Sequence, residues 1–160
     1  MPTPAALAAL VHPWAALYAD STAVSNAVTF AHLAGVVLGG GAAVTLDRET
    51  LLAPRLDDAG RAHLLGRLRR AHPWVLAGLA VTFVSGLLQL AADLDTFLPS
   101  GLFWAKMALV ALLVANGVLV LRGELAAAAG RWAPLRLSAG VSLSLWTVIL
   151  LLGVLVTNAA

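Results

Sequence analysis

Long apolar stretches separated by short polar segments run through the chain. Four of them are long enough to cross a membrane as helices, since a helix needs about 20 apolar residues to span the hydrocarbon core. They lie at about 24–46, 73–92, 100–121 and 136–157. The pattern therefore predicts an all-α fold, a four-helix transmembrane bundle, in which residues 1–160 form a single integral membrane domain.

The ends of these stretches carry residues that are typical of helix boundaries. Prolines stand near the expected starts of the last three spans, where a missing backbone N–H does no harm: Pro73, Pro99 and Pro134. Residues 1–20 are too few and too interrupted to span. Their Trp14 and Tyr18 favour a short N-terminal interfacial helix that lies on the membrane surface.

Arginine placement indicates the orientation of the bundle. Most basic residues lie in or next to two connections, 47–71 and 122–135: Arg48, Arg55, Arg61, Arg67, Arg69, Arg70, Arg122, Arg131 and Arg136. The connection between the second and third spans has only Asp93 and Asp95 as charged residues. Because arginine-rich loops stay in the cytoplasm, we expect both arginine-bearing connections to be cytoplasmic and both chain termini to lie outside.

The composition supports a membrane location and excludes some chemistry. Hydrophobic residues make up 61% of the chain and charged residues 11%, whereas a soluble protein has about 25% charged residues. We therefore expect the lipid bilayer to surround the protein. The net charge of +2 comes from arginines that the topology requires, so we expect no nucleic-acid partner. Cysteine is absent, which excludes disulfides, thiolate metal sites and thiol catalysis.

Two ionisable residues fall inside the predicted spans at similar depth. His32 lies about 10 Å in from the outer end of the first span, and Lys106 lies about 9 Å in from the outer end of the third. On the second span, Gln89 and Ser85 fall at about 6 and 12 Å. The outer third of the bundle is thus expected to gather four polar side chains, whereas Asn116 is the main polar residue of the inner half.

Lys106 has no acidic partner within the predicted spans, and a charged residue in a membrane usually faces the bundle interior with a partner. Three outcomes remain open. The lysine stem can carry the ammonium group to the outer headgroups. The amine can be neutral, because removal from water disfavours its charged form. It can also meet an anion that the sequence does not supply, namely a ligand carboxylate or phosphate.

Small residues follow His32 along one face of the first span. Gly35, Gly39 and Ala43 lie on the same helical face as His32. One interpretation is close helix–helix contact, because small residues drive helix packing in lipid. The other is that a flat ligand lies against the glycine face beneath His32. The charged residues 47–49 then mark the cytoplasmic exit of the span.

The other histidines are weaker candidates. His72 lies at the cytoplasmic end of the second span, too far from His32 for both to ligate one haem. His12 and His63 are expected to be solvated. Copper is poorly supported, since Cu(I) sites use clusters of cysteine or methionine and the chain has only two methionines.

Four segments carry a resemblance to known proteins: FAHLAGVVLGGGAAVTLDRETLL, HPWVLAGLAVTFVSGLLQLAADLDTFL, GLFWAKMALVALLVANGVLVLR and SLSLWTVILLLGVLV. Together they are similar to a bacterial family of four-helix integral membrane proteins of unknown function. That family has a histidine early in helix one, a small-residue run ending in Leu-Asp-x-x, a lysine early in helix three, and a Ser-x-x-x-Trp-like element in helix four. The resemblance covers nearly the whole chain and implies the bacterial inner membrane.

More distantly, the chain resembles two proteins of the same layout, the four-helix bacterial protoporphyrinogen oxidase and the membrane domain of the copper-resistance D family. A helix-one histidine and a helix-three lysine of the oxidase are implicated in haem binding and activity, and they match His32 and Lys106. The oxidase pattern also implies aromatic and arginine residues after the first histidine, and a second histidine near Asn116 and Gly117. Because the chain departs there, the resemblance implies a b-type haem or porphyrin but not the oxidase activity.

Two functional hypotheses follow. In the first, the protein binds b-type haem or a porphyrin and is redox active, with His32 as an axial iron ligand and Lys106 as the opposite ligand or the partner of a propionate. The predicted cofactor-binding set is His32, Lys106, Gly35, Gly39, Ser85 and Gln89. In the second, the protein is a non-enzymatic structural or accessory subunit, or a copper-resistance D-like membrane protein. A homodimer or a membrane redox partner fits either hypothesis, and transport is weaker because internal repeats and broken helices are not evident.

Overall fold

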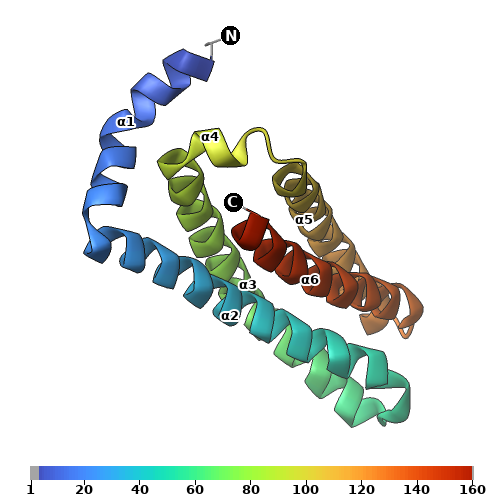
Figure 1. The fold of residues 1–160 in the computed structure, drawn as a ribbon. Coiled ribbons are helices and arrows are strands. Elements are labelled where there is room, and N and C mark those ends of the chain that lie inside the picture. Colours follow the sequence, from blue (N-terminus) through green and yellow to red (C-terminus); the bar gives the residue numbers. More distant parts are fainter. Residues whose placement is uncertain (1–3, 160) are drawn as a thin grey trace.

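The computed structural model describes the backbone of residues 4–159 and the side chains of residues 9–156. Within this range the chain is helical apart from short turns, and it contains no strand. The elements in chain order are α1 (Pro4–Asp20), α2 (Thr22–Leu52), the 3₁₀ helix η1 (Ala53–Arg55), α3 (Asp58–Ala92), α4 (Leu94–Phe97), α5 (Gly101–Ala128) and α6 (Ala133–Ala159) (Figure 1). The predicted four-helix transmembrane bundle with a short N-terminal helix is confirmed, because α2, α3, α5 and α6 are long and apolar enough to span a membrane.

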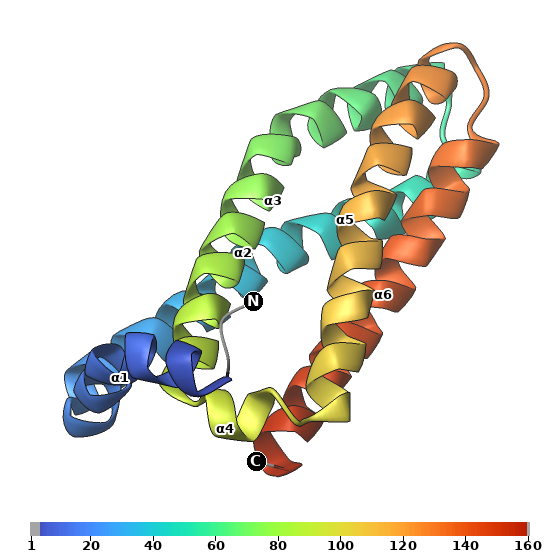
Figure 2. The same cartoon turned by 90° about the horizontal axis from the view of Figure 1, so that it is seen from above.

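The four long helices form two hairpins. α2 packs along α3, α5 packs along α6, and α2 also contacts α6. The α2–α3 and α5–α6 turns lie at one end of the bundle, here called the arginine end, and α4 lies at the opposite end, here called the α4 end (Figure 2). α3 and α5 approach each other at the arginine end and diverge toward the α4 end (Figure 2).

Side-chain caps and a glycine turn define the helix ends. The hydroxyl of Ser21 accepts a hydrogen bond from the Val24 N–H at 3.4 Å, and the carboxylate of Asp57 accepts one from the Gly60 N–H at 2.8 Å. These caps satisfy N–H groups that the first turns of α2 and α3 leave unpaired. After α5 the chain reverses at Gly130, whose φ of 82° suits a residue without a Cβ.

The helices extend well beyond the apolar stretches at the arginine end. α3 begins at Asp58, so residues 58–72, expected in the connection, are helical. The expectation that Pro73 stands near a helix start is therefore wrong, since Pro73 lies in the interior of α3 and cannot donate a hydrogen bond to the preceding turn. The physical reason is that hydropathy marks the part of a helix that meets lipid, while arginine, leucine and alanine continue the helix beyond it.

The buried core is small and lies at two levels. At the arginine end, six buried residues from α2, η1, α3, α5 and α6 pack together: Leu46, Ala53, Leu64, Leu68, Ala127 and Leu135. Nearer the middle of the bundle, Leu113 of α5 packs with Trp146 and Ile149 of α6. Many other large apolar side chains are exposed on the bundle surface, as is expected where the surrounding solvent is lipid.

The N-terminal helix α1 packs against α3 and the start of α2. Its Trp14 donates a hydrogen bond from Nε1 to the carbonyl oxygen of Leu88 in α3, at 2.8 Å. The Trp14 and Tyr18 rings lie 5.9 Å apart. The indole therefore ties α1 to the part of α3 nearest the α4 end, and the expected position of α1 on the membrane surface stays a prediction.

Candidate functional site

His32 and Ser85 form a hydrogen bond between α2 and α3. The His32 Nδ1 atom lies 3.1 Å from the Ser85 hydroxyl oxygen, and Ser85 is buried. The Ser85 hydroxyl donates its own proton to the carbonyl oxygen of Val81, at 2.6 Å. A serine hydroxyl has one proton to donate, and with that proton on the Val81 carbonyl its oxygen is an acceptor for His32 Nδ1–H. In the neutral tautomer protonated on Nδ1, the lone pair is on Nε2.

The Lys106 side chain lies beside another helix, α6. The lysine Nζ lies 3.5 Å from the position that a Cβ on Gly153 of α6 would occupy. This distance is an ordinary van der Waals contact, so the amine lies against α6 at Gly153. His32 and Lys106 therefore turn toward different neighbours, the first toward α3 and the second toward α6.

Of the other predicted site residues, Ser85 forms a hydrogen bond with His32, whereas Gln89 forms none with it. Gln89 is half-buried and lies one turn beyond Ser85 on α3. Within the described side chains, the Gln89 amide makes no hydrogen bond. The expected gathering in the outer third is therefore centred on the His32–Ser85 pair, with Lys106 nearby.

The glycine face of α2 is a helix-packing surface. A Cβ added at Gly35 would lie 2.8 Å from the carbonyl oxygen of Gly78, and one added at Gly39 would lie 3.1 Å from the carbonyl oxygen of Val75. Gly40, on the adjacent face, is covered by the Trp146 ring of α6, 3.0 Å from a hypothetical Cβ. The backbone of α3 thus occupies the space at Gly35 and Gly39, and a planar ligand on that face would have to displace the helix.

Several polar side chains are buried among α2, α5 and α6, and of these only Asn116 was singled out from the sequence. Asn116 of α5 donates from Nδ2 to the carbonyl oxygen of Ser138 in α6, at 3.0 Å. One turn further along α6, Ser142 is buried, and so is Asp47 of α2. Asp47 Oδ2 and Asn116 Oδ1 are buried without a hydrogen-bond partner among the described residues. The four-residue spacing of the two serines, which places them on one helical face, was the available sequence signal.

Glu124 and His72 join α5 to α3 at the arginine end. Glu124 is buried, and its Oε1 atom lies 3.6 Å from Nε2 of His72. His72 lies 13 residues before Ser85, the partner of His32, which separates the two positions by about 20 Å along the α3 axis. His12 and His63 are exposed, as expected.

The described residues include no group of three or more histidine, aspartate or glutamate side chains that could hold a metal ion. A single imidazole is a poor site for a bare ion, which needs several protein ligands. A haem iron differs because the porphyrin supplies four nitrogen ligands and the protein adds one or two axial ones. His32 therefore fits a metalloporphyrin better than a free metal ion.

The fold and the hydropathy of its helices define a multi-pass α-helical membrane protein. No family model, curated protein or solved structure matches the chain. The similarity to the bacterial four-helix family therefore stays a prediction.

Proposed function

We propose that the protein binds a b-type haem or a related porphyrin in the half of the bundle toward the α4 end, with Nε2 of His32 as an axial iron ligand. The observation that carries this proposal is the hydrogen bond between His32 Nδ1 and Ser85. A metal-ligating histidine usually donates its second ring N–H to a neighbouring acceptor, which fixes the tautomer and the ring orientation. Ser85 supplies that acceptor because its own proton is already used on Val81.

A second residue, Lys106, also supports a porphyrin as the ligand. Lys106, whose amine lies beside Gly153 of α6, would supply either an ammonium group for a propionate or, if neutral and turned toward His32, a second amine ligand for the iron. Because α3 covers Gly35 and Gly39, the ring is not expected on that face of α2. A bound haem would supply one-electron chemistry for a membrane redox partner.

The test is the optical spectrum of the protein purified in detergent, before and after titration with hemin. We expect a Soret band that follows hemin with a one-to-one endpoint and is lost in His32→Leu. His63→Leu is the matched control, since His63 is exposed on the distant part of α3. Ser85→Ala is expected to weaken binding by about 10- to 100-fold, as the loss of a supporting hydrogen bond does at other metal sites. No Soret band after hemin addition, or full binding by His32→Leu, would overturn the proposal.

The same hemin titration, carried out on a Lys106→Met variant, distinguishes the two roles proposed for Lys106. If Lys106 ligates the iron, Lys106→Met changes the spectrum from six-coordinate low-spin to five-coordinate high-spin or to methionine-ligated. If Lys106 pairs with a propionate, the spectrum stays as in the wild type and the hemin affinity falls. Lys106→Met with unchanged spectrum and unchanged affinity would remove Lys106 from the proposed site.

A structural or accessory role is a second candidate, which a different observation favours. Several side-chain hydrogen bonds join two different helices, among them those of His32 to Ser85, Asn116 to Ser138, Trp14 to Leu88 and Arg67 to Glu49. Polar contacts of this kind stabilise helix association in lipid. Under this candidate function, His32→Leu lowers the unfolding temperature in detergent and the wild type takes up no hemin.

A further inference from the structure

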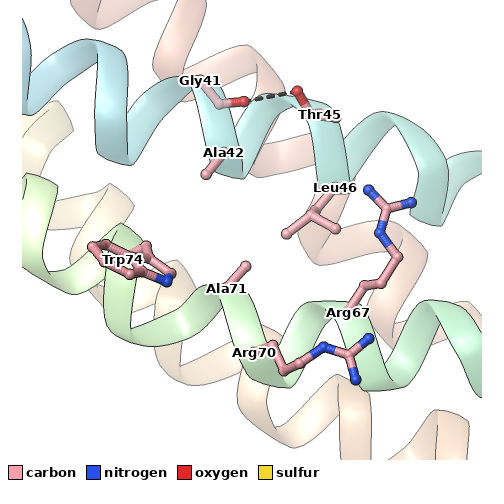
Figure 3. A pocket seen from close by; sticks show the side chains of 8 residues that line it. All are labelled: Gly41, Ala42, Thr45, Leu46, Arg67, Arg70, Ala71 and Trp74. Atoms are coloured by element: carbon pink, nitrogen blue, oxygen red, sulfur yellow. Dashed lines mark hydrogen bonds between the residues drawn. The ribbon is translucent and has the colours of Figure 1, made fainter.

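A groove between α2 and α3 lies on the bundle surface at the arginine end. Its volume is about 550 Å³. Small residues form its floor, Gly41 and Ala42 from α2 and Ala71 from α3, and Figure 3 shows Trp74 at one end and the guanidinium groups of Arg67 and Arg70 toward the other. The groove begins where the close glycine contact of α2 and α3 ends, and a Cβ at Gly41 would meet no atom within 4 Å.

The two arginines differ in how their charges are satisfied. Arg67 donates to the carboxylate of Glu49 at 2.5 Å, which is an ion pair between α3 and α2. Arg70 is exposed and forms no ion pair with any residue that the structure describes. The groove therefore ends in one free guanidinium group beside a second, partly neutralised one. This is a complementary surface for a single anionic group.

The groove is apolar along its floor and basic at one end, which matches the apolar chain and anionic headgroup of a lipid. Trp74 and Arg70 are four residues apart on α3, which separates them by about 6 Å along the helix axis. Tryptophan and arginine side chains are typical of the level where hydrocarbon meets headgroups. An acyl chain can follow the small-residue floor past Trp74 while a phosphate reaches Arg70. A soluble anion would use the arginines but would gain nothing from the apolar floor.

We propose that this groove binds one anionic glycerophospholipid, with its phosphate at Arg70 and Arg67 and an acyl chain along Gly41, Ala42 and Ala71. Basic pockets between transmembrane helices bind anionic headgroups in this way. A second copy of the chain is a worse occupant. A two-fold symmetric contact through this groove would place equivalent arginines of the two copies near each other. Glu49, which already pairs with Arg67, is the acidic partner at the groove, so the arginines of the two copies would repel each other.

The experiment is native mass spectrometry of the purified protein in detergent, titrated with dioleoylphosphatidylglycerol or dioleoylphosphatidylcholine. We expect one phosphatidylglycerol to bind with clear preference over phosphatidylcholine. Arg70→Gln is expected to lower phosphatidylglycerol affinity about fivefold, the effect of about one basic residue on an anionic lipid, and to leave phosphatidylcholine unchanged. Arg131→Gln is the matched control because Arg131 is an exposed arginine in the other turn.

Gly41→Leu tests the apolar part of the groove independently of charge. The new side chain fills the groove floor, so we expect weaker binding of phosphatidylglycerol than in Gly117→Leu, a control at another helical glycine with open space around it. Gel filtration and the unfolding temperature confirm that both variants remain folded. Equal binding of the two lipids, wild-type binding by Arg70→Gln and Gly41→Leu, or complete displacement by millimolar inorganic phosphate would overturn the lipid assignment.

Discussion

Replacing Gly35 by alanine tests the close approach of α2 and α3 on which the position of His32 depends. A methyl group at Gly35 would lie 2.5 Å from the Thr82 hydroxyl oxygen and 2.8 Å from the Gly78 carbonyl oxygen, whereas ordinary contacts begin at 3.4 Å. The Thr82 side chain can rotate away. The Gly78 carbonyl belongs to the backbone, so the two helices must separate by about 0.6 Å (3.4 against 2.8 Å) to accept the methyl group.

The expected cost follows from the dispersion energy that such a separation removes. A gap of about 0.5–1 Å forfeits about a quarter to a half of each atom contact. If the glycine crossing makes about as many contacts as one buried leucine, about 50 at about 0.1–0.2 kcal/mol each, the loss is about 1–5 kcal/mol, with a central value of about 3 kcal/mol. Alanine in a helix returns about 1 kcal/mol relative to glycine. The central net destabilisation of about 2 kcal/mol corresponds to about a 30-fold change in the unfolding equilibrium.

The assay is reversible unfolding in mixed detergent micelles, followed by circular dichroism and tryptophan fluorescence. Gly117→Ala is the control, because a Cβ at Gly117 would meet no atom within 4 Å, and we expect it to be neutral or to stabilise the protein by up to about 1 kcal/mol. If Gly35→Ala is as stable as Gly117→Ala, the helices do not approach each other as closely as the structure shows, and the argument from glycine packing fails.

Three further substitutions test the core and the polar links. Trp146→Ala is expected to cost about 3–5 kcal/mol, as the loss of a buried aromatic ring does, whereas Trp104→Ala costs little because Trp146 is 5% exposed and Trp104 is 54% exposed; equal unfolding free energies would contradict this. Asn116→Ala removes an interhelical hydrogen bond and is expected to cost about 0.5–2 kcal/mol in the same assay, so an unchanged midpoint would count against the bond. A double-mutant cycle with His72→Gln and Glu124→Gln is expected to give a coupling of about 0.5–3 kcal/mol, and strictly additive effects would show that the pair does not link α3 to α5.

Hydropathy predicted the helices but not where they end. The number and order of the spans follow from apolar length, because crossing the hydrocarbon core requires it. The helical continuation over residues 58–72 could not be predicted this way, since that segment is polar and still helical. Pro73 added to the error, because proline is common in the first turn of a helix and only the three-dimensional structure places it inside α3.

The sequence predicted those features of the candidate site that depend only on how deep each residue lies along its helix. Counting residues from the outer ends placed His32 and Ser85 at one level, and they form a hydrogen bond. Depth does not determine which neighbouring helix a side chain faces, so the contact of Lys106 with α6 was not predictable. The burial of Asp47 and Glu124 was missed for the same reason. Both stand among arginines in the sequence, and their inward rotation depends on how the helices pack.

The pairing of neighbouring helices bears on how the protein is assembled. The α2–α3 and α5–α6 contacts join segments adjacent in the chain, while the two pairs are held together mainly by α2 on α6, with the smaller contact of α3 and α5. Each pair can therefore enter the bilayer and form as a unit during synthesis, with docking of α2 on α6 as the final event. A polypeptide severed within residues 93–100 retains both units whole, so co-expressed halves are expected to reassociate without a covalent connection.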